Sequence, residues 1–413
     1  MKKKIAALII ILSLAFSVIS ATKHLQHHNQ ELSLKSYLGI FHILKKNTET
    51  NECAAIQKEI SFYSVGCKKI NTSEIISNNS KAKYSGIFEL KGILYVLTSD
   101  GNLYTKSDGG FHFLKKLDLL NLDTSIFGGL LNSIFVPGKN LLITYSLNSR
   151  DQNRYLLLTI FDAKNFKKIN QIKLTNTNTL PSQLGGGMAF DKENLYLSIG
   201  VASQDFVDNQ SQEGLNPNSL YGKIVSIPLN KIEEKIEDIN IFSSGHKHLQ
   251  GLLKTKNAFI GVEHSVEDGD EINLLKISKN YGYNDFGYTK HHMANKKTYY
   301  FNKNRTLYED PIYYFTPEAA LSDIEKCVFD GFENNYAYNP CIIVSSLAQQ
   351  SIFIVKFKRE SNAEIIPKNP TVINTEKIQI GERVRKVKNL NEKNSLFVLT
   401  DNLNIFFLTF VPK

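Results

Sequence analysis

Gly92-Ile93-Leu94-Tyr95-Val96-Leu97, followed by Ser99-Asp100-Gly101-Asn102 and Leu103-Tyr104, consists of two short apolar runs separated by a polar turn. Runs this short, rich in Ile, Val, Tyr and Phe and broken by Asn, Asp and Gly, are typical of strands joined in a hairpin. The unit recurs along the chain, with paired runs at 141–145 and 155–160, 195–200 and 222–227, 259–262 and 271–275, 341–344 and 352–355, and 396–399 and 405–408.

Six such hairpins, spaced by about 40–50 residues, indicate a repeated β-sheet blade. Blades that pack radially leave only short, protected sheet edges. The sequence therefore predicts an all-β protein, a six-bladed β-propeller over residues 86–413. A double-sheet sandwich is the competing architecture, but it would not be expected to repeat one unit so regularly over this length. Residues 22–85 do not share the repeat, and we expect them to form an N-terminal extension of uncertain structure.

Residues 1–21 have the features of a secretory signal peptide. Lysines at positions 2–4 precede a mostly apolar run over 5–19, which ends near the small residue Ala21. The run falls short of the roughly 20 residues that span a bilayer, so cleavage is favoured over retention as an anchor. No later segment is apolar enough to cross a membrane. We therefore expect a periplasmic or secreted protein.

The four cysteines fit that compartment. Cys53 and Cys67 form one sequence-local pair, and Cys327 and Cys341 form the other. An even cysteine count in an exported chain predicts disulfides, and neither pair is a C-x-x-C motif of zinc or thioredoxin-like chemistry. Four buried free thiols are the alternative.

The composition is that of a globular protein with a large core. The 413 residues are 42% hydrophobic and 22% charged, with a formal net charge of +9. Nucleic acid is not the expected partner, because the lysines are scattered rather than clustered on one stripe.

Four stretches in order along the chain resemble one enzyme family. They are Gly128-Gly129-Leu130-Leu131; Gly185-Gly186-Gly187-Met188-Ala189-Phe190; Gly245-His246-Lys247-His248-Leu249-Gln250-Gly251-Leu252 with Glu263-His264, Gly269-Asp270-Glu271-Ile272-Asn273 and Asn280-Tyr281-Gly282-Tyr283; and Arg383-Val384-Arg385. They resemble the G-G-L-L, H-x-G-G-R-L-x-F, G-h-R-N-p-Q-G-L, D-E-I-N, N-Y-G-W and R-I-R-D-V motifs of the glucose/sorbosone dehydrogenases.

The resemblance implies a six-bladed propeller that oxidises aldose sugars with pyrroloquinoline quinone (PQQ) and calcium. Arg383 and Arg385 match cofactor-binding arginines, and Lys247 and His248 occupy further cofactor-pocket positions. Guanidinium groups suit a cofactor with three carboxylates. Glu271 and Tyr281 fall where the family places a calcium-binding carboxylate and carbonyl, and calcium takes oxygen ligands.

The positions that carry the family's chemistry are largely replaced. The catalytic His falls on Gln183, the Arg of the same motif on Gly187, a cofactor-contacting Gln on Phe127, a Lys on Ala348, and the calcium-holding G-P on Ser265 and Val266. Gln has no titration near neutral pH, and loss of a general base costs about 10²–10⁴ in rate. Those magnitudes argue against an ordinary sugar dehydrogenase.

Three functions remain open. The first is a dehydrogenase-family propeller that binds a small sugar-like or carboxylated ligand, with doubtful redox activity. The second is a non-catalytic binding module of the cell envelope. The third is an active enzyme with a rearranged site, in which His248 or an acidic residue acts as the base. The other histidines considered, His246, His264, His291 and His292, are interpreted as structural or solvated.

Overall fold

The computed structural model describes residues 53, 56, 59–61, 63–78, 81–125, 128–151, 153–177, 183–201, 214, 216–234, 239–264, 269–283, 305–327, 339–360, 366–390 and 394–413. The chain divides into two compact units, residues 1–54 and 55–413. Only Cys53 of the first unit is described, so the predicted signal peptide and most of the N-terminal extension lie outside the described residues.

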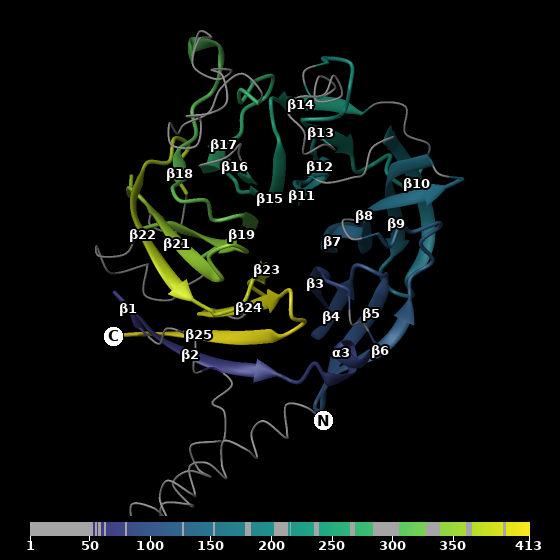
Figure 1. Cartoon of the computed structure of the whole chain (residues 1–413), viewed down its shortest axis with the longest axis horizontal. Coiled ribbons are helices and arrows are strands. Elements are labelled where there is room, and N and C mark those ends of the chain that lie inside the picture. Colours follow the sequence, from purple (N-terminus) through teal and green to yellow (C-terminus); the bar gives the residue numbers. More distant parts are fainter. Residues whose placement is uncertain are drawn as a thin grey trace, which may run out of the picture. The chain divides into compact units, whose positions relative to one another are not determined.

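The second unit is a six-bladed β-propeller, as predicted (Figure 1). Each blade is an antiparallel sheet that begins with an inner strand and ends with an outer one. The first three blades are β3 (Tyr84–Leu90), β4 (Ile93–Thr98), β5 (Asn102–Ser107) and β6 (Gly110–Lys116); β7 (Gly129–Val136), β8 (Leu141–Arg150), β9 (Asn153–Asp162) and β10 (Lys167–Thr177); and β11 (Gly185–Phe190), β12 (Asn194–Ile199), β13 (Lys223–Pro228) and β14 (Asn240–Ser244).

The remaining three blades follow the same order. They are β15 (His248–Lys254), β16 (Phe259–His264), β17 (Asp270–Leu274) and β18 (Tyr313–Phe315); β19 (Leu321–Lys326), β20 (Cys341–Ser346), β21 (Ser351–Phe357) and β22 (Val372–Gln379); and β23 (Val384–Lys388), β24 (Ser395–Thr400) and β25 (Ile405–Pro412), completed by β2 (Tyr63–Ile70) and β1 (Glu59–Ile60). The helices are short: α3 (Ser73–Asn78), η1 (Pro137–Lys139) and η4 (Arg305–Leu307).

All six predicted hairpins are present, and each forms the two middle strands of its blade. These strands have neighbouring strands on both edges and blades on both faces. They are therefore nearly continuous apolar runs; every residue of β20 is buried. This central position in the blade explains why the sequence pattern predicts the two middle strands of each blade.

The ring closes with strands from opposite ends of the sequence. β2 pairs antiparallel with β25 over its whole length, from Tyr63 opposite Pro412 to Ile70 opposite Ile405. The inner strand β23 contacts β3, the inner strand of the first blade. The propeller therefore starts earlier than the expected boundary at residue 86. Residues 63–70, which the sequence placed in the N-terminal extension, form an outer strand of the last blade.

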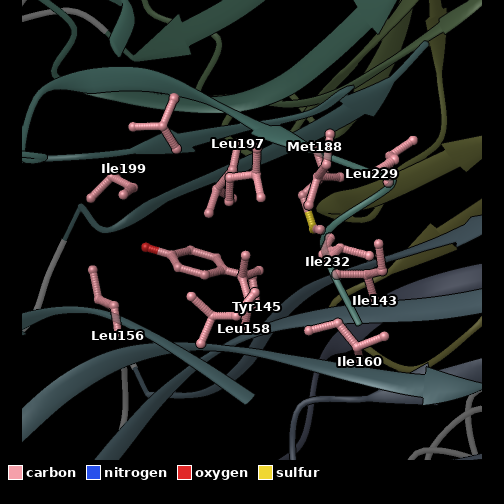
Figure 2. Close-up of a cluster of buried hydrophobic side chains, with 14 of the residues drawn as sticks. Ile143, Tyr145, Leu156, Leu158, Ile160, Met188, Leu197, Ile199, Leu229 and Ile232 are labelled. Atoms are coloured by element: carbon pink, nitrogen blue, oxygen red, sulfur yellow. The ribbon is translucent and has the colours of Figure 1, made fainter. Parts of the chain in front are cut away.

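Large apolar clusters lie between the blades. One of them joins β8 and β9 to β11, β12 and β13, and includes Ile143, Tyr145, Leu158 and Leu197 (Figure 2). Tyr145 is fully buried, and its hydroxyl donates to the carbonyl of Leu184 at 2.9 Å. This packing fixes the segment that leads into β11, which contributes to the site described below.

The predicted cysteine chemistry is confirmed. Cys327 and Cys341 are bonded, with 5.5 Å between their Cα atoms, and the bond joins the end of β19 to the start of β20. Cys53 and Cys67 are also disulfide-bonded, and none of the four cysteines is free. None of the helices in the described ranges is long and apolar enough to cross a membrane.

Candidate functional site

The starts of the inner strands bring several cations together, and we call Lys83, Lys247, Arg383 and Arg385 the cationic cluster. Lys83 precedes β3, Lys247 precedes β15, and Arg385 lies at the start of β23. Burial, and next the charge of Arg385, lower the pKa of Lys83. Lys247 and Arg385 likewise act electrostatically on the same two histidines, His248 and His264. The sequence-predicted cofactor residues Lys247, His248, Arg383 and Arg385 are therefore neighbours.

Asp401, just after β24, is the carboxylate that holds the two arginines. Arg385 donates from Nε and Nη2 to its two oxygens at 2.7 and 2.9 Å, and Arg383 Nε donates to it at 3.0 Å. Burial alone would raise the pKa of Asp401, but the hydrogen bonds and charges of Arg385 and Arg383 lower it. Asp401 thus faces three cations of the cluster, Arg385, Arg383 and Lys83, so these four groups together carry a net positive charge.

Sequence reasoning missed Lys83 and Asp401. Asp401 lies in the turn Asp401-Asn402-Leu403-Asn404 between two predicted strands, where an Asp is ordinarily a turn former. Lys83 lies in the part of the chain that lacked the repeat. Only the closed ring, in which β23 contacts β3, brings them together.

His248 has hydrogen-bond partners on both ring nitrogens. Its Nδ1 lies 3.0 Å from the backbone nitrogen of Gly185, so Nδ1 accepts that N–H. Its Nε2, which then carries the proton, lies 2.6 Å from the position of Gln250 Nε2, and the two groups bond when the amide is turned so that its oxygen accepts from His248. Burial, and next the neighbouring His264 and Lys247, hold the pKa of His248 well below its ordinary value. This neutral imidazole has no lone pair available for a substrate.

His264 is the second imidazole of the site, and its ring meets that of His248 edge-on at 4.9 Å. Burial lowers the pKa of His264 to about 4, against a hydrogen bond with the backbone of Leu321 that acts in the opposite direction. Its Nε2 is buried and has no hydrogen-bond partner among the described residues. His264 therefore has the available lone pair, on a weakly basic ring.

Gln183 lies in the segment that enters β11 and has a left-handed backbone, with φ of 62°. Its Oε1 is buried and, within the described part of the chain, has no hydrogen-bond partner. Gly185 is also left-handed, and a Cβ there would meet Ser198 O at 2.7 Å. This glycine therefore serves the contact between β11 and β12, not only the approach of a ligand.

Gly187 is enclosed by the next blade. A Cβ at this position would meet Leu249 Cδ2 at 2.9 Å, Leu252 Cγ at 3.0 Å and the backbone carbon of Gly251 at 3.2 Å. The family's arginine therefore has no room here without movement of β11 and β15. The loss of this cofactor contact is built into the packing of two inner strands.

A buried chain of polar groups supports Lys247. His246 Nδ1 lies 3.0 Å from Glu263 Oε2, His246 Nε2 lies 2.9 Å from Ser243 Oγ, and the other oxygen of Glu263 accepts the Lys247 N–H. As whole residues, His246, Glu263 and Ser243 are at most 3% exposed. His246 is thus a structural residue, in keeping with its interpretation from sequence.

The predicted calcium ligands lie beside this chain. Glu271 is buried on β17 and is directly paired with Glu263 on β16. Tyr281 follows the bridge residue Asn280, and its ring stacks on His246 at 4.8 Å. Asn273 Nδ2 donates to Glu271 at 3.1 Å, while Asn273 Oδ1 is buried and has no partner among the described residues.

These groups fit a hard cation. Two buried carboxylates at opposite positions of paired strands bring like charges together, and a cation beside them would offset that repulsion. The unpartnered Asn273 oxygen adds a neutral ligand of the kind calcium accepts. No set of three His, Cys, Asp or Glu side chains in the described ranges is arranged for a metal, so carbonyl oxygens such as that of Tyr281 would have to complete the site.

Several sequence-predicted positions lie elsewhere. Ala348 is exposed in the turn between β20 and β21, and its N–H donates to Ala319 O at 3.1 Å. The positions outside the described residues are Phe127, Ser265, Val266, His291 and His292.

The fold and this cluster define the class of protein: a six-bladed β-propeller with a cationic site where its inner strands begin. A family model for glucose/sorbosone dehydrogenases matches residues 89–407. The chain belongs to the glucose/sorbosone dehydrogenase family.

Known proteins agree with this placement. An uncharacterised protein of Synechocystis sp. is 24% identical over 334 residues, 75% of this chain and 76% of that protein. The soluble aldose sugar dehydrogenase of Escherichia coli, solved in its apo form, has a TM-score of 0.65 at 18% identity over 85% of this chain and 100% of that one. The PQQ-bound aldose sugar dehydrogenase of Streptomyces coelicolor has a TM-score of 0.56 at 18% identity over 86% of this chain and 100% of that one. At these identities, the structures show a shared fold.

Proposed function

We propose that this chain is an exported member of its family that binds a small carboxylated ligand at the cationic cluster and oxidises aldoses weakly or not at all. The observation that carries the proposal is a contrast within one site. Arg383, Arg385 and Lys83 outnumber the Asp401 carboxylate that they face, whereas His248, which is bonded to Gly185 two residues after the replaced catalytic position, has hydrogen-bond partners on both ring nitrogens.

The cluster suits carboxylates, PQQ among them. Charge-assisted hydrogen bonds contribute roughly 1.5–3 kcal/mol each, and a planar guanidinium can donate two in parallel. Arg385 and Arg383 would hold carboxylate groups of such a ligand, with Lys83 and Lys247 adding long-range attraction. When bound, a quinone of this kind supplies a hydride acceptor.

Aldose oxidation also needs a general base to take up the proton of the sugar hydroxyl, and the site lacks a suitable one among its described residues. A general base works best when its pKa lies near the operating pH. Gln183 does not titrate, His248 uses its lone pair on Gly185, and burial lowers the pKa of His264 to about 4. His264 is the one imidazole of this described site with a lone pair left, so it is the residue to which residual turnover would be traced.

Export is supported by the two disulfides, because such bonds persist in oxidising compartments. Calcium, held by Glu271 and the Tyr281 carbonyl, is proposed on the buried pair Glu263 and Glu271 and on the orphaned oxygen of Asn273.

The deciding experiment titrates the purified, full-length protein with PQQ in the presence of calcium and then assays dye reduction with several aldoses. Saturable PQQ binding that weakens at least tenfold in Arg385→Gln, together with turnover near background, is the expected result. Absence of PQQ binding, with other carboxylates also inert, would favour the alternative of a non-catalytic binding module. Robust turnover by the native protein would overturn the proposed loss of activity, and His264→Gln would then be the next variant.

A further inference from the structure

A second cavity lies on the propeller axis. Its volume is about 290 Å³, and all six inner strands contribute to its wall. The lining comes from the later residues of these strands, such as Glu89 on β3 and Lys388 on β23. The cationic cluster lies where the same strands begin, so the two sites occupy opposite ends of the axis.

One side of this axial cavity is apolar. β7 contributes Ile134 and Phe135, and β11 contributes Met188 and Phe190. Phe88 of β3 packs against Phe135, with 5.6 Å between ring centroids. These side chains form a wall suited to the carbon face of a small ring.

The other side, from β19 and β23, is charged but internally paired. Lys388 Nζ contacts Glu325 at 2.6 Å. Lys386 Nζ lies 3.9 Å from Asp323 Oδ1, which is beyond hydrogen-bond distance, although Lys386 is only 7% exposed. A single group that both donates and accepts could bridge that separation.

Asn389, directly after β23, provides an unused donor. Its Nδ2 is buried and lacks a hydrogen-bond partner among the described residues. A buried amide left without a partner costs about 1–3 kcal/mol, so a ligand acceptor here would recover free energy.

We propose that the axial cavity binds a neutral, hydroxyl-rich molecule of monosaccharide size. Hydroxyl groups both donate and accept hydrogen bonds. They can therefore accept from Lys386 and Asn389 and donate to Asp323 without breaking an ion pair. An ionic ligand would have to compete with the existing pairs and desolvate its own charge. The apolar wall opposite receives the ring's carbon face. This site is separate from the carboxylate site of the proposed function.

The test uses methyl α-D-glucopyranoside, a neutral pyranose whose blocked anomeric carbon prevents oxidation. Calorimetry or saturation-transfer NMR on the full-length protein, without quinone, should show one saturable site. Ile134→Trp, which fills the cavity, should abolish binding. Asn389→Leu should weaken it about fivefold, the loss of one hydrogen bond.

Asn389→Leu also keeps the test independent of folding, because the amide nitrogen it removes has no hydrogen-bond partner among the described residues, and its melting temperature should equal or exceed the native value. Asn257→Leu, at an exposed turn, is the matched control, and Arg385→Gln at the other end of the axis should leave glucoside binding unchanged. No saturable binding, unchanged affinity in Ile134→Trp and Asn389→Leu, or loss in Arg385→Gln would each overturn the proposal.

Discussion

Arg385 donates two parallel hydrogen bonds to the carboxylate of Asp401, at 2.7 Å from Nε and 2.9 Å from Nη2. Arg383 donates to the same carboxylate at 3.0 Å. Asp401 therefore orients both arginines and also neutralises part of the charge that an entering carboxylate would meet. It is an internal competitor for the proposed ligand.

Asp401→Asn should tighten PQQ binding about tenfold, because one charge-assisted contact is returned to the ligand. The same change should lower the melting temperature, since Arg383 and Arg385 lose their partner. Calorimetric titration measures the first effect and thermal unfolding the second. Asp118→Asn, which removes an exposed ion pair with Lys168 on the second blade, is the control and should change neither. Weaker PQQ binding in Asp401→Asn would show that orientation of the arginines matters more than their charge.

Stability should depend on pH through His264. The unfolded chain protonates this residue near pH 6.5, whereas the folded protein does so only near pH 4. Between these values the unfolded state binds more protons, so the free energy of unfolding falls as the pH falls from about 6.5 to about 4. A difference of this size corresponds to roughly 3 kcal/mol, at about 1.36 kcal/mol for each pH unit between the two values.

Urea unfolding at pH 7.5 and pH 5.0 measures this effect. His264→Gln should remove part of the difference between the two midpoints, because the pKa of His248 is also lowered by burial and contributes in the same direction. His112→Gln, at an exposed position on β6, should leave the difference unchanged. An equal pH response in native protein and His264→Gln would contradict the prediction.

Calcium removal should lower the melting temperature of the native protein by about 5 °C, because an ion bound only by the folded state stabilises it by mass action. Glu271→Gln should abolish that response. Glu193→Gln, an exposed carboxylate between β11 and β12, should respond to chelator as the native protein does. A native melting curve that is the same with and without chelator would mean that the Glu263 and Glu271 pair is stabilised in some other way.

Restoring the catalytic side chain should raise aldose oxidation more than restoring the arginine. Gln183→His places an imidazole at the family's base position and should increase PQQ-dependent turnover by at least tenfold over the native rate. Gly187→Arg should instead destabilise the protein by about 1–3 kcal/mol, since its Cβ meets Leu249, Leu252 and the backbone of Gly251. Dye reduction and thermal unfolding of both single variants test the pair. A stable Gly187→Arg protein with improved PQQ affinity would refute the packing argument.

The fold was largely predictable from local pattern because the middle strands of each blade are buried on both faces and are read as apolar runs. The pairing that closes the ring was not predictable, because β2 is an ordinary strand of mixed burial and its partner β25 lies at the other end of the sequence. The candidate site, too, was predictable in some of its residues and not in others. Arg383, Arg385, Lys247 and His248 could be placed by motif.

The partners of those residues could not be predicted. The Gly185 N–H that occupies His248, the Asp401 carboxylate and the packing around Gly187 are all contacts between segments that the sequence separates widely. Whether a motif residue is chemically available depends on such contacts.

The pairing of β2 with β25 also sets the order of events during synthesis. The ribosome makes β2 before any inner strand and β25 after all six inner strands, so the ring cannot close until β25 has been synthesised. Until then β2 has an unpaired edge, a form of strand that readily pairs with other chains. That edge of β2 therefore stays available for pairing with other chains until β25 is made, and a protein that lacked β25 would keep it unpaired.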